Sequence, residues 1–174
     1  IAANASQELI QIAEMMNAPV ALTLMGKGSI PDDHPLCTGL TGMHGTGASN
    51  MLVSEADVLL VVGARMSDRT TAKLDEFCPG TKIIQINIDR SEIDKNVETV
   101  TRVIGDAKLS LQGISQRLGQ IRKDPAKNDN WLNRLDHFRK EYVVPEYVSN
   151  PHMSAVTAMK AVSALHYSCL RIGS

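Results

Sequence analysis

Aromatic residues are scarce in this chain of 174 residues: they make up 3% of it, and Trp131 is its single tryptophan. Sheet sandwiches and barrels usually contain more aromatic side chains, so this scarcity disfavours an all-β fold. The chain is nevertheless 43% hydrophobic, which excludes a disordered or fibrous protein. A core of Ala, Val, Ile, Leu and Met favours helices packed around a buried parallel sheet.

An excess of charge of one sign is also lacking. Eighteen Lys and Arg residues stand against nineteen Asp and Glu residues, with no basic stripe, so we expect neither nucleic acid nor an anionic membrane as the main partner. No apolar run reaches the roughly 20 residues that a membrane-spanning helix needs. The first residues also lack the basic and then apolar layout of a secretory signal. These observations predict a cytoplasmic protein.

Cysteines are few and lack the spacing of a metal or disulfide site. Cys37, Cys78 and Cys169 are odd in number and form no CxxC pair, which favours buried or incidental thiols. His44 lies in a glycine-rich loop, where it can contact a ligand or form hydrogen bonds within the loop. The other four histidines show no metal-ligand spacing, so we expect no metal site. No nucleophile elbow or pair of acids predicts a catalytic residue.

Helical and strand-like segments alternate along the chain. The patterns predict helices over 5–17, 47–56, 73–80 and 107–121, and strands over 20–24, 57–63, 81–89 and 101–104, with the second strand fully buried and a long loop over 25–47. Ser6 and Asp106 are the expected N-caps of the first and last of these helices. The alternation is typical of an α/β fold with an open, doubly wound parallel sheet and flanking helices, a Rossmann-like, NAD/FAD-binding architecture.

The predicted domain covers residues 1–121. We expect residues 122–174 to form a charged linker followed by helices, the first of them over 131–142 and the last beginning at residue 154.

Polar, glycine-bearing turns follow the predicted strands. They cover residues 25–28, 63–69, 87–89 and 105–107. Doubly wound sheets bind ligands beyond the carboxyl ends of their strands, where small residues admit a ligand and helix N-termini attract phosphate. Arg65 and Arg69 can pair with such a phosphate. The pattern favours a nucleotide-like ligand, with the alternative that the glycines only form tight turns; the strict GxGxxG fingerprint is absent.

Three motifs carry a more specific resemblance. They are GMHGT at Gly42–Thr46, GAR followed by DR at Gly63–Arg69, and I.I..SEI.KN at Ile86–Asn96. In their order and spacing they resemble the central domain of the acetohydroxyacid synthase family, the large catalytic subunits of acetolactate synthase. The resemblance continues through Gly105–Ala107 and covers 131–142, and only the last residues, 166–174, do not match.

The resemblance implies a thiamine-diphosphate enzyme of three domains. In this family, thiamine diphosphate and magnesium lie between the two outer domains, across a dimer. The reaction decarboxylates pyruvate and transfers the hydroxyethyl unit to a second 2-keto acid, in branched-chain amino-acid biosynthesis. The central domain binds FAD, which has no redox role in the main reaction. The implied partners are the other domains of the parent enzyme, further copies of it in a homo-oligomer, and a regulatory subunit.

Carried over to this chain, the resemblance implies a set of FAD-binding residues. Those that line the flavin nucleotide are Thr23, Leu24, Met25, Gly42, Met43 and His44. Those at the ribityl and phosphate region are Gly63, Ala64 and Arg65, with Arg69 near the substrate channel. Those at the adenosine end are Asn87, Ile88, Gly105, Asp106 and Ala107.

The sequence departs from the family in two places. The family usually has Asp at the position of Asn87, so contact with a ribose is altered here. Met66 and Ser67 stand where the family has an aromatic residue and an acid, which we expect to alter flavin packing and the channel.

The family's first strand, with its glycine-rich turn, falls before the position of Ile1, and its catalytic groups belong to the outer domains. We therefore expect the isolated chain to be inactive, to bind FAD weakly and to associate through an exposed sheet edge. One alternative is a free-standing nucleotide-binding or scaffold module of the same fold. Another is the central domain of a different thiamine-diphosphate carboligase, oxidase or decarboxylase, which GMHGT and GAR..DR disfavour.

Overall fold

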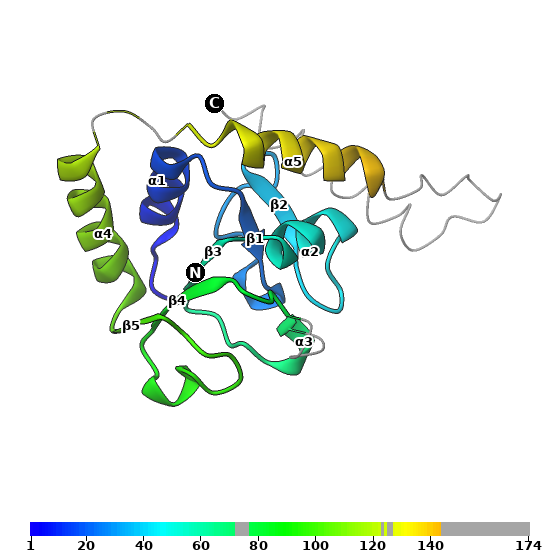
Figure 1. Ribbon diagram of the computed structural model, residues 1–174. Helices are drawn as coiled ribbons and strands as arrows, with labels where there is room; N and C mark the ends of the chain where they lie inside the picture. Colours follow the sequence, from blue (N-terminus) through cyan, green and yellow to red (C-terminus); the bar gives the residue numbers. More distant parts are fainter. Residues whose placement is uncertain (72–76, 123, 125–126, 144–174) are drawn as a thin grey trace, which may run out of the picture. The chain divides into compact units, whose positions relative to one another are not determined.

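The computed structural model describes residues 1–71, 77–122, 124 and 127–143. The chain divides into two compact units, Ile1–Tyr142 and Val143–Ser174, and the elements below belong to the first. Residues 73–76 of the helix predicted over 73–80, the helix predicted from residue 154, and Cys169 lie outside the described residues. The described part of the first of these, 77–80, forms bends and a turn, so the prediction of a helix there is wrong. In the first unit, helices alternate with strands, which confirms the predicted α/β class (Figure 1).

The elements follow one another in this order: α1 (Ser6–Met16), β1 (Val20–Leu22), the short 3-10 helix η1 (Leu24–Gly26), β2 (Cys37–Leu40), α2 (Gly47–Ser54), β3 (Val58–Val62), α3 (Asp68–Thr71), β4 (Lys82–Asn87), the 3-10 helix η3 (Arg90–Glu92), β5 (Thr101–Ile104), α4 (Ala107–Ile121) and α5 (Asp129–Glu141). β5 and α4 have the bounds that the sequence predicts, and β4 and α1 differ from the prediction by one or two residues at each end. α3 lies in a segment that was predicted as a turn.

All the strands pair in parallel, as expected, but in two sheets. β1 pairs with β2, and β4 lies between β3 and β5. The prediction of one open sheet is therefore wrong for the part of the chain that the structure describes. In Figure 1 the strands succeed one another across the unit in the order β5, β4, β3, β1, β2, so the break in pairing falls between β3 and β1.

β2 lies inside the segment that was predicted to be a loop. Its four residues include Thr38 and Gly39 and carry no alternating or continuous apolar pattern, so local sequence gives no strand signal. Tertiary contacts form the strand instead: the Thr38 hydroxyl donates to the Val20 carbonyl at 3.2 Å and lies 2.9 Å from the Ser49 hydroxyl on α2. The expectation of a loop over the whole of 25–47 is corrected accordingly.

β3 is less buried than expected. Val61 is buried, but Val58 is 49% exposed, and the remaining residues are half-buried. The prediction of a fully buried strand is wrong because β3 is an edge strand, bonded on one side only, to β4.

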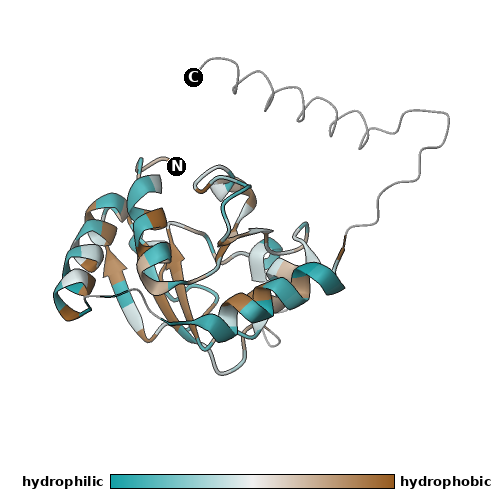
Figure 2. Cartoon of the chain, turned by 90° about the horizontal axis from the view of Figure 1, so that it is seen from above, coloured by the Kyte–Doolittle hydropathy of each residue, from teal (hydrophilic) through white to brown (hydrophobic). Residues whose placement is uncertain are grey.

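Helix α1 packs against both sheets. Its Ile12 belongs to a cluster with Ile86 of β4 and Leu111 of α4, while Ile10 packs against the cluster that contains Leu22 of β1. One helix thus covers the break between the sheets. In Figure 2 the strands are mostly brown, whereas the flanking helices carry broad hydrophilic faces, as expected of helices that cover an apolar sheet on one side.

The helix ends test two predicted caps. Asp106 caps α4, since its carboxylate accepts a hydrogen bond from the Leu109 N–H at 3.0 Å. The cap predicted at Ser6 is wrong: Ala5 occupies the N-cap position, and Ser6 is the first helical residue. The other end of α1 follows the sequence, because Asn17 takes the left-handed conformation, with φ of 49°, two residues before Pro19.

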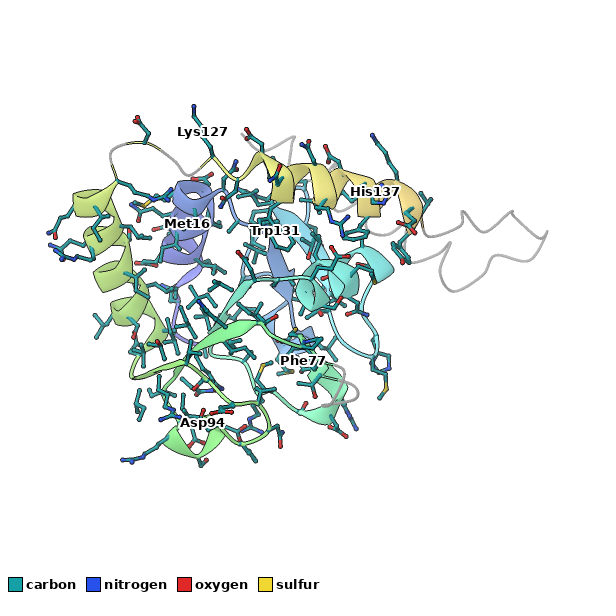
Figure 3. The ribbon with its side chains drawn as sticks, in the orientation of Figure 1. Met16, Phe77, Asp94, Lys127, Trp131 and His137 are labelled. Atoms are coloured by element: carbon teal, nitrogen blue, oxygen red, sulfur yellow. The ribbon has the colours of Figure 1, made fainter. Side chains whose placement is uncertain are left out.

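Helix α5 packs against α2. Leu135 and Phe138 form a buried cluster with Ala48 and Leu52, and Trp131, labelled in Figure 3, packs at its margin. The compact unit Ile1–Tyr142 therefore includes α5. Within the described ranges, no helix is long and apolar enough to cross a membrane.

Candidate functional site

Apart from Arg69, which lies on α3, the residues singled out as ligand-binding lie where the five strands end, in segments that we call the carboxyl-edge turns. They follow β1 (residues 23–25), β2 (42–44), β3 (63–65), β4 (87–88) and β5 (105–107). Because the strands within each sheet are parallel, the turns of a sheet lie at one edge of it. This is the edge at which open α/β sheets bind ligands.

Asn87 joins the three turns of the β3–β4–β5 sheet. Its side-chain N–H group reaches the Ala64 carbonyl at 3.5 Å, its side-chain oxygen accepts from the Asp89 N–H at 3.0 Å, and its backbone carbonyl accepts from the Gly105 N–H at 3.1 Å. The residue is only 7% exposed. The side chain expected to face a ribose therefore organises the turns around it. An amide suits this role because a carboxylate at this position has no proton to donate to Ala64.

The turn after β2 meets helix α3. The Met43 N–H donates to the Arg69 carbonyl at 2.9 Å. At Gly42, φ is +95°, and a Cβ atom would collide with that same carbonyl and lie 3.1 Å from the Cα of Thr70. Only glycine fits this conformation and this approach. The contact connects the predicted residues of one sheet with Arg69, which follows a strand of the other.

Large apolar side chains are exposed along the carboxyl-edge turns. The most exposed is Met25, at 87%. We call this set the apolar rim; its members are Leu24, Met25, Met43, Ile88 and Ile104. Exposed apolar side chains at the edge where open α/β sheets bind ligands indicate a surface that another group can cover. Four of the five were predicted; Ile104 was missed, although its place directly before Gly105 was a usable signal.

Charged groups lie beside the rim. The Arg65 side chain is 77% exposed, and its Nε is 3.9 Å from a carboxylate oxygen of Glu92, which also pairs with Lys95 at 3.0 Å. Hydrogen bonds from the Ser91 hydroxyl and N–H, and then the charges of Arg65 and Lys95, lower the pKa of Asp89. Arg69 is exposed as well. Two exposed guanidinium groups therefore stand at this edge, and each can pair with an anionic ligand.

The remaining predicted residues differ in their surroundings: two cap helices, one is exposed and one is buried in the core. Thr23 caps η1 by accepting from the Gly26 N–H at 3.2 Å, and Asp106 caps α4. His44 is exposed. Met66, which was expected to affect flavin packing, is 5% exposed in a core cluster with Val61 and Ile83, so it can act on a ligand only through that core.

Besides Ile104, a second side chain of the site was not predicted. Asn50, on α2, accepts from the Gly42 N–H at 2.7 Å and from the Thr41 hydroxyl at 3.0 Å, and its N–H group donates to the Gly42 carbonyl at 3.0 Å. A polar residue in the otherwise apolar and small pattern of α2 was the available signal. Among the residues that the structure describes, no group of three His, Cys, Asp or Glu side chains could hold a metal ion.

Comparison with known proteins identifies the family. The family model described as "Thiamine pyrophosphate enzyme, central domain" matches residues 1–114, which include all five carboxyl-edge turns. A probable acetolactate synthase large subunit of Methanocaldococcus jannaschii is 45% identical over 140 residues, 80% of this chain and 23% of that protein. Acetolactate synthase 1, chloroplastic, of Zea mays is 35% identical over 164 residues, 94% of this chain and 26% of that protein.

The chain thus spans about a quarter of the length of these curated relatives. The match confirms the resemblance that the three motifs carry, and its extent agrees with the region in which they occur. The chain belongs to the family of thiamine pyrophosphate enzyme central domains, and over most of its length it is similar to acetolactate synthase large subunits.

Proposed function

We propose that the carboxyl-edge turns and the apolar rim bind FAD, as the central domain of an acetolactate synthase large subunit. One observation carries the proposal: the apolar rim is exposed at the edge where parallel strands place ligands, beside the guanidinium groups of Arg65 and Arg69. A flavin has a flat apolar ring, which an apolar surface suits, and a pyrophosphate, which guanidinium groups suit. Gly63, exposed and with φ of +59°, leaves its turn open to a ligand.

For the whole protein we propose the activity that the relatives' name states, acetolactate synthase. We infer that the parent enzyme decarboxylates pyruvate and condenses the remaining two-carbon unit with a second 2-keto acid, on thiamine diphosphate and magnesium held by other domains. This chain supplies the surface for FAD, and none of its described residues is proposed to act catalytically. The partners are those other domains, a second copy of the large subunit, and a regulatory subunit, in keeping with the name "large subunit" of the relatives. The cytoplasmic location stays a prediction from the sequence.

We further propose that one more strand pairs between β1 and β3. Among the described residues, β1 is bonded to β2 alone and β3 to β4 alone, yet α1 packs against both sheets. An added strand would bond to both free edges and make one sheet of the two. Its own following turn would reach the carboxyl edge, so we expect FAD to bind only weakly, with a Kd above the micromolar range, as long as no strand is paired there.

Backbone NMR of the chain, titrated with FAD to millimolar concentration, tests the site. We expect the amide signals of Gly42, Gly63 and Gly105 to shift. Gly113 and Gly119 on α4 are matched controls, since each is exposed and a Cβ atom added there would have no neighbour within 4 Å, and their signals should stay in place. ADP and FMN should each shift only part of the set, because ADP lacks the flavin and its ribityl chain and FMN lacks the adenosine.

Three results would contradict the proposals. Shifts that are absent at millimolar FAD, or equal at Gly113 and Gly119, would exclude the carboxyl edge as the FAD site and favour a module whose glycines only form turns. Micromolar or tighter binding would leave the site in place but exclude the need for a further strand. Formation of acetolactate from pyruvate by the isolated chain would exclude the division of roles proposed here.

A further inference from the structure

We propose that Asn50 is a positioning residue of the carboxyl edge: its side-chain amide fixes Gly42, and through Gly42 it holds the Met43 N–H on the Arg69 carbonyl. The inference rests on the proposed function, because it is that function which makes the turn after β2 part of a ligand surface. Asn50 is not among the residues proposed to contact FAD; it supports one of the turns that carry them.

The first step is the clamp on Gly42. The Asn50 side chain bonds both backbone groups of this one residue, the N–H at 2.7 Å and the carbonyl at 3.0 Å, and the Thr41 hydroxyl at 3.0 Å completes the set. Binding a donor and an acceptor at once requires an amide side chain. An aspartate would keep the bonds from Gly42 N–H and Thr41 but would place a carboxylate oxygen against the Gly42 carbonyl.

The second step is the rigidity of the residue that holds the clamp. Asn50 lies on the first turns of α2, whose N-cap, Thr46, accepts from the Ser49 N–H at 3.2 Å. Ser49 is fully buried and bonds Thr38 on β2. The amide of Asn50 is therefore fixed relative to the strand that leads into the turn, so it acts as a support and does not follow the movement of the turn.

The third step is the connection between the sheets. With Gly42 fixed at φ of +95°, the Met43 N–H meets the Arg69 carbonyl at 2.9 Å. Figure 1 shows the turn after β2 near α3. The series Asn50, Gly42, Met43, Arg69 thus runs from a helix of one sheet to a helix that follows a strand of the other. Without the clamp, the hydrogen bond from the Met43 N–H would no longer hold this residue of the apolar rim in place on Arg69.

Hydrogen exchange followed by NMR tests the clamp without any ligand. In Asn50→Ala we expect the amides of Gly42 and Met43 to exchange at least about tenfold faster, while the Ile86 amide of β4 keeps its rate. The Gly42 N–H loses its acceptor, and the Met43 N–H loses the fixed turn that holds it on the Arg69 carbonyl. A merely structural role would instead speed exchange at all three. Asn128→Ala is the matched control: it removes another asparagine bond to a backbone carbonyl, that of Met16 at 2.5 Å, and should leave Met43 unchanged.

Two further variants keep the test decisive if Asn50→Ala does not fold. Asn50→Asp should expose the Met43 amide nearly as much as alanine does, because the donor to Gly42 is lost. Thr41→Val should have a small effect, because the clamp on Gly42 remains. Unchanged Met43 exchange in both Asn50 variants would overturn the inference.

FAD titration of the same variants adds the functional readout. We expect Asn50→Ala and Asn50→Asp to weaken FAD binding about tenfold, which corresponds to about 1.4 kcal/mol, and Asn128→Ala to leave it unchanged. If the unaltered chain binds no FAD, the proposed function fails, and the exchange rates alone decide the role of Asn50. If FAD binds equally well to all variants while Met43 exchange is faster, Asn50 does not position the ligand surface, and the inference is overturned.

Discussion

Gly42 combines two constraints that can be separated by mutation: a positive φ of +95° and a close approach to the backbone of Arg69 and Thr70. Gly80 has nearly the same φ, +83°, with no atom within 4 Å of a Cβ position. Gly80→Ala should therefore cost only the conformational strain, about 1 to 2 kcal/mol in the free energy of unfolding. Gly42→Ala should cost about 1 to 3 kcal/mol more, because the methyl group displaces the turn.

Chemical denaturation of both variants measures the difference. Equal losses of stability would mean that the turn after β2 can move away from α3 at no cost. That result would also count against a fixed contact between Met43 and Arg69, which Gly42→Ala is expected to break.

Single residues show what the sequence could and could not predict about the site. Met25 and Met43 stood out because they lie in a loop, away from helical core spacing, and both are exposed at the carboxyl edge. The inward role of Asn87 could not be predicted, because its partners, Ala64 and Gly105, belong to turns far from it in sequence. Residue types thus indicate a ligand edge, while the choice between facing a ligand and bracing a turn depends on contacts formed only in the fold.

At the scale of elements, α5 is an integral part of the compact unit. Leu135→Ala should lower the free energy of unfolding by about 2 to 5 kcal/mol, because Leu135 is 2% exposed between α5 and α2. Leu109→Ala is the matched control on α4: this leucine is 70% exposed, and its truncation should change stability by less than about 0.5 kcal/mol. Denaturation followed by circular dichroism measures both, and a loss below about 1 kcal/mol for Leu135→Ala would mean that α5 packs only loosely.

The elements that sequence predicted well are those whose signal is local. β4 has a continuous apolar run, and α4 has a capping aspartate and a helical apolar stripe, so each formed where the pattern places it. β2 has no such pattern, and it forms because β1, Ser49 and Arg139 supply its partners; Arg139 donates to the Cys37 carbonyl at 2.7 Å. The packing of α5 on α2 likewise depends on tertiary contacts that an amphipathic pattern cannot assign to a particular neighbour.

At the scale of the whole molecule, the parallel arrangement was predictable and the division into two sheets was not. Alternating helices and strands require parallel pairing by crossover connections, whereas strand order and the break between β1 and β3 do not follow from the pattern of any one segment. The two sheets are held together by α1 and by the contact of Met43 with Arg69. The stability of the unit therefore depends on groups buried between elements, and one of them makes it sensitive to pH.

That group is Cys78, whose Sγ donates to the Val53 carbonyl at 3.1 Å, between the end of α2 and the start of β4. Burial raises the pKa of the Cys78 thiol from 9.0 to about 11. Between these values the unfolded chain loses the proton that the folded chain keeps, so the free energy of unfolding falls as the pH rises, by at most about 3 kcal/mol. Near pH 7 this group has almost no effect, because the thiol is protonated in both states.

Urea denaturation at a series of pH values from 7 to 11 measures this fall. Cys78→Ala should be less stable than the original chain at pH 7, because a buried sulfur is lost, but its stability should decline less over the alkaline range. The test is how steeply the free energy of unfolding falls with pH in each protein, because this slope reports the titration of the thiol. The difference in stability at pH 7 reports only the loss of the buried sulfur. Parallel declines in the two proteins would mean that the thiolate is tolerated in the folded unit, and that Val53 and Cys78 separate before the unit unfolds.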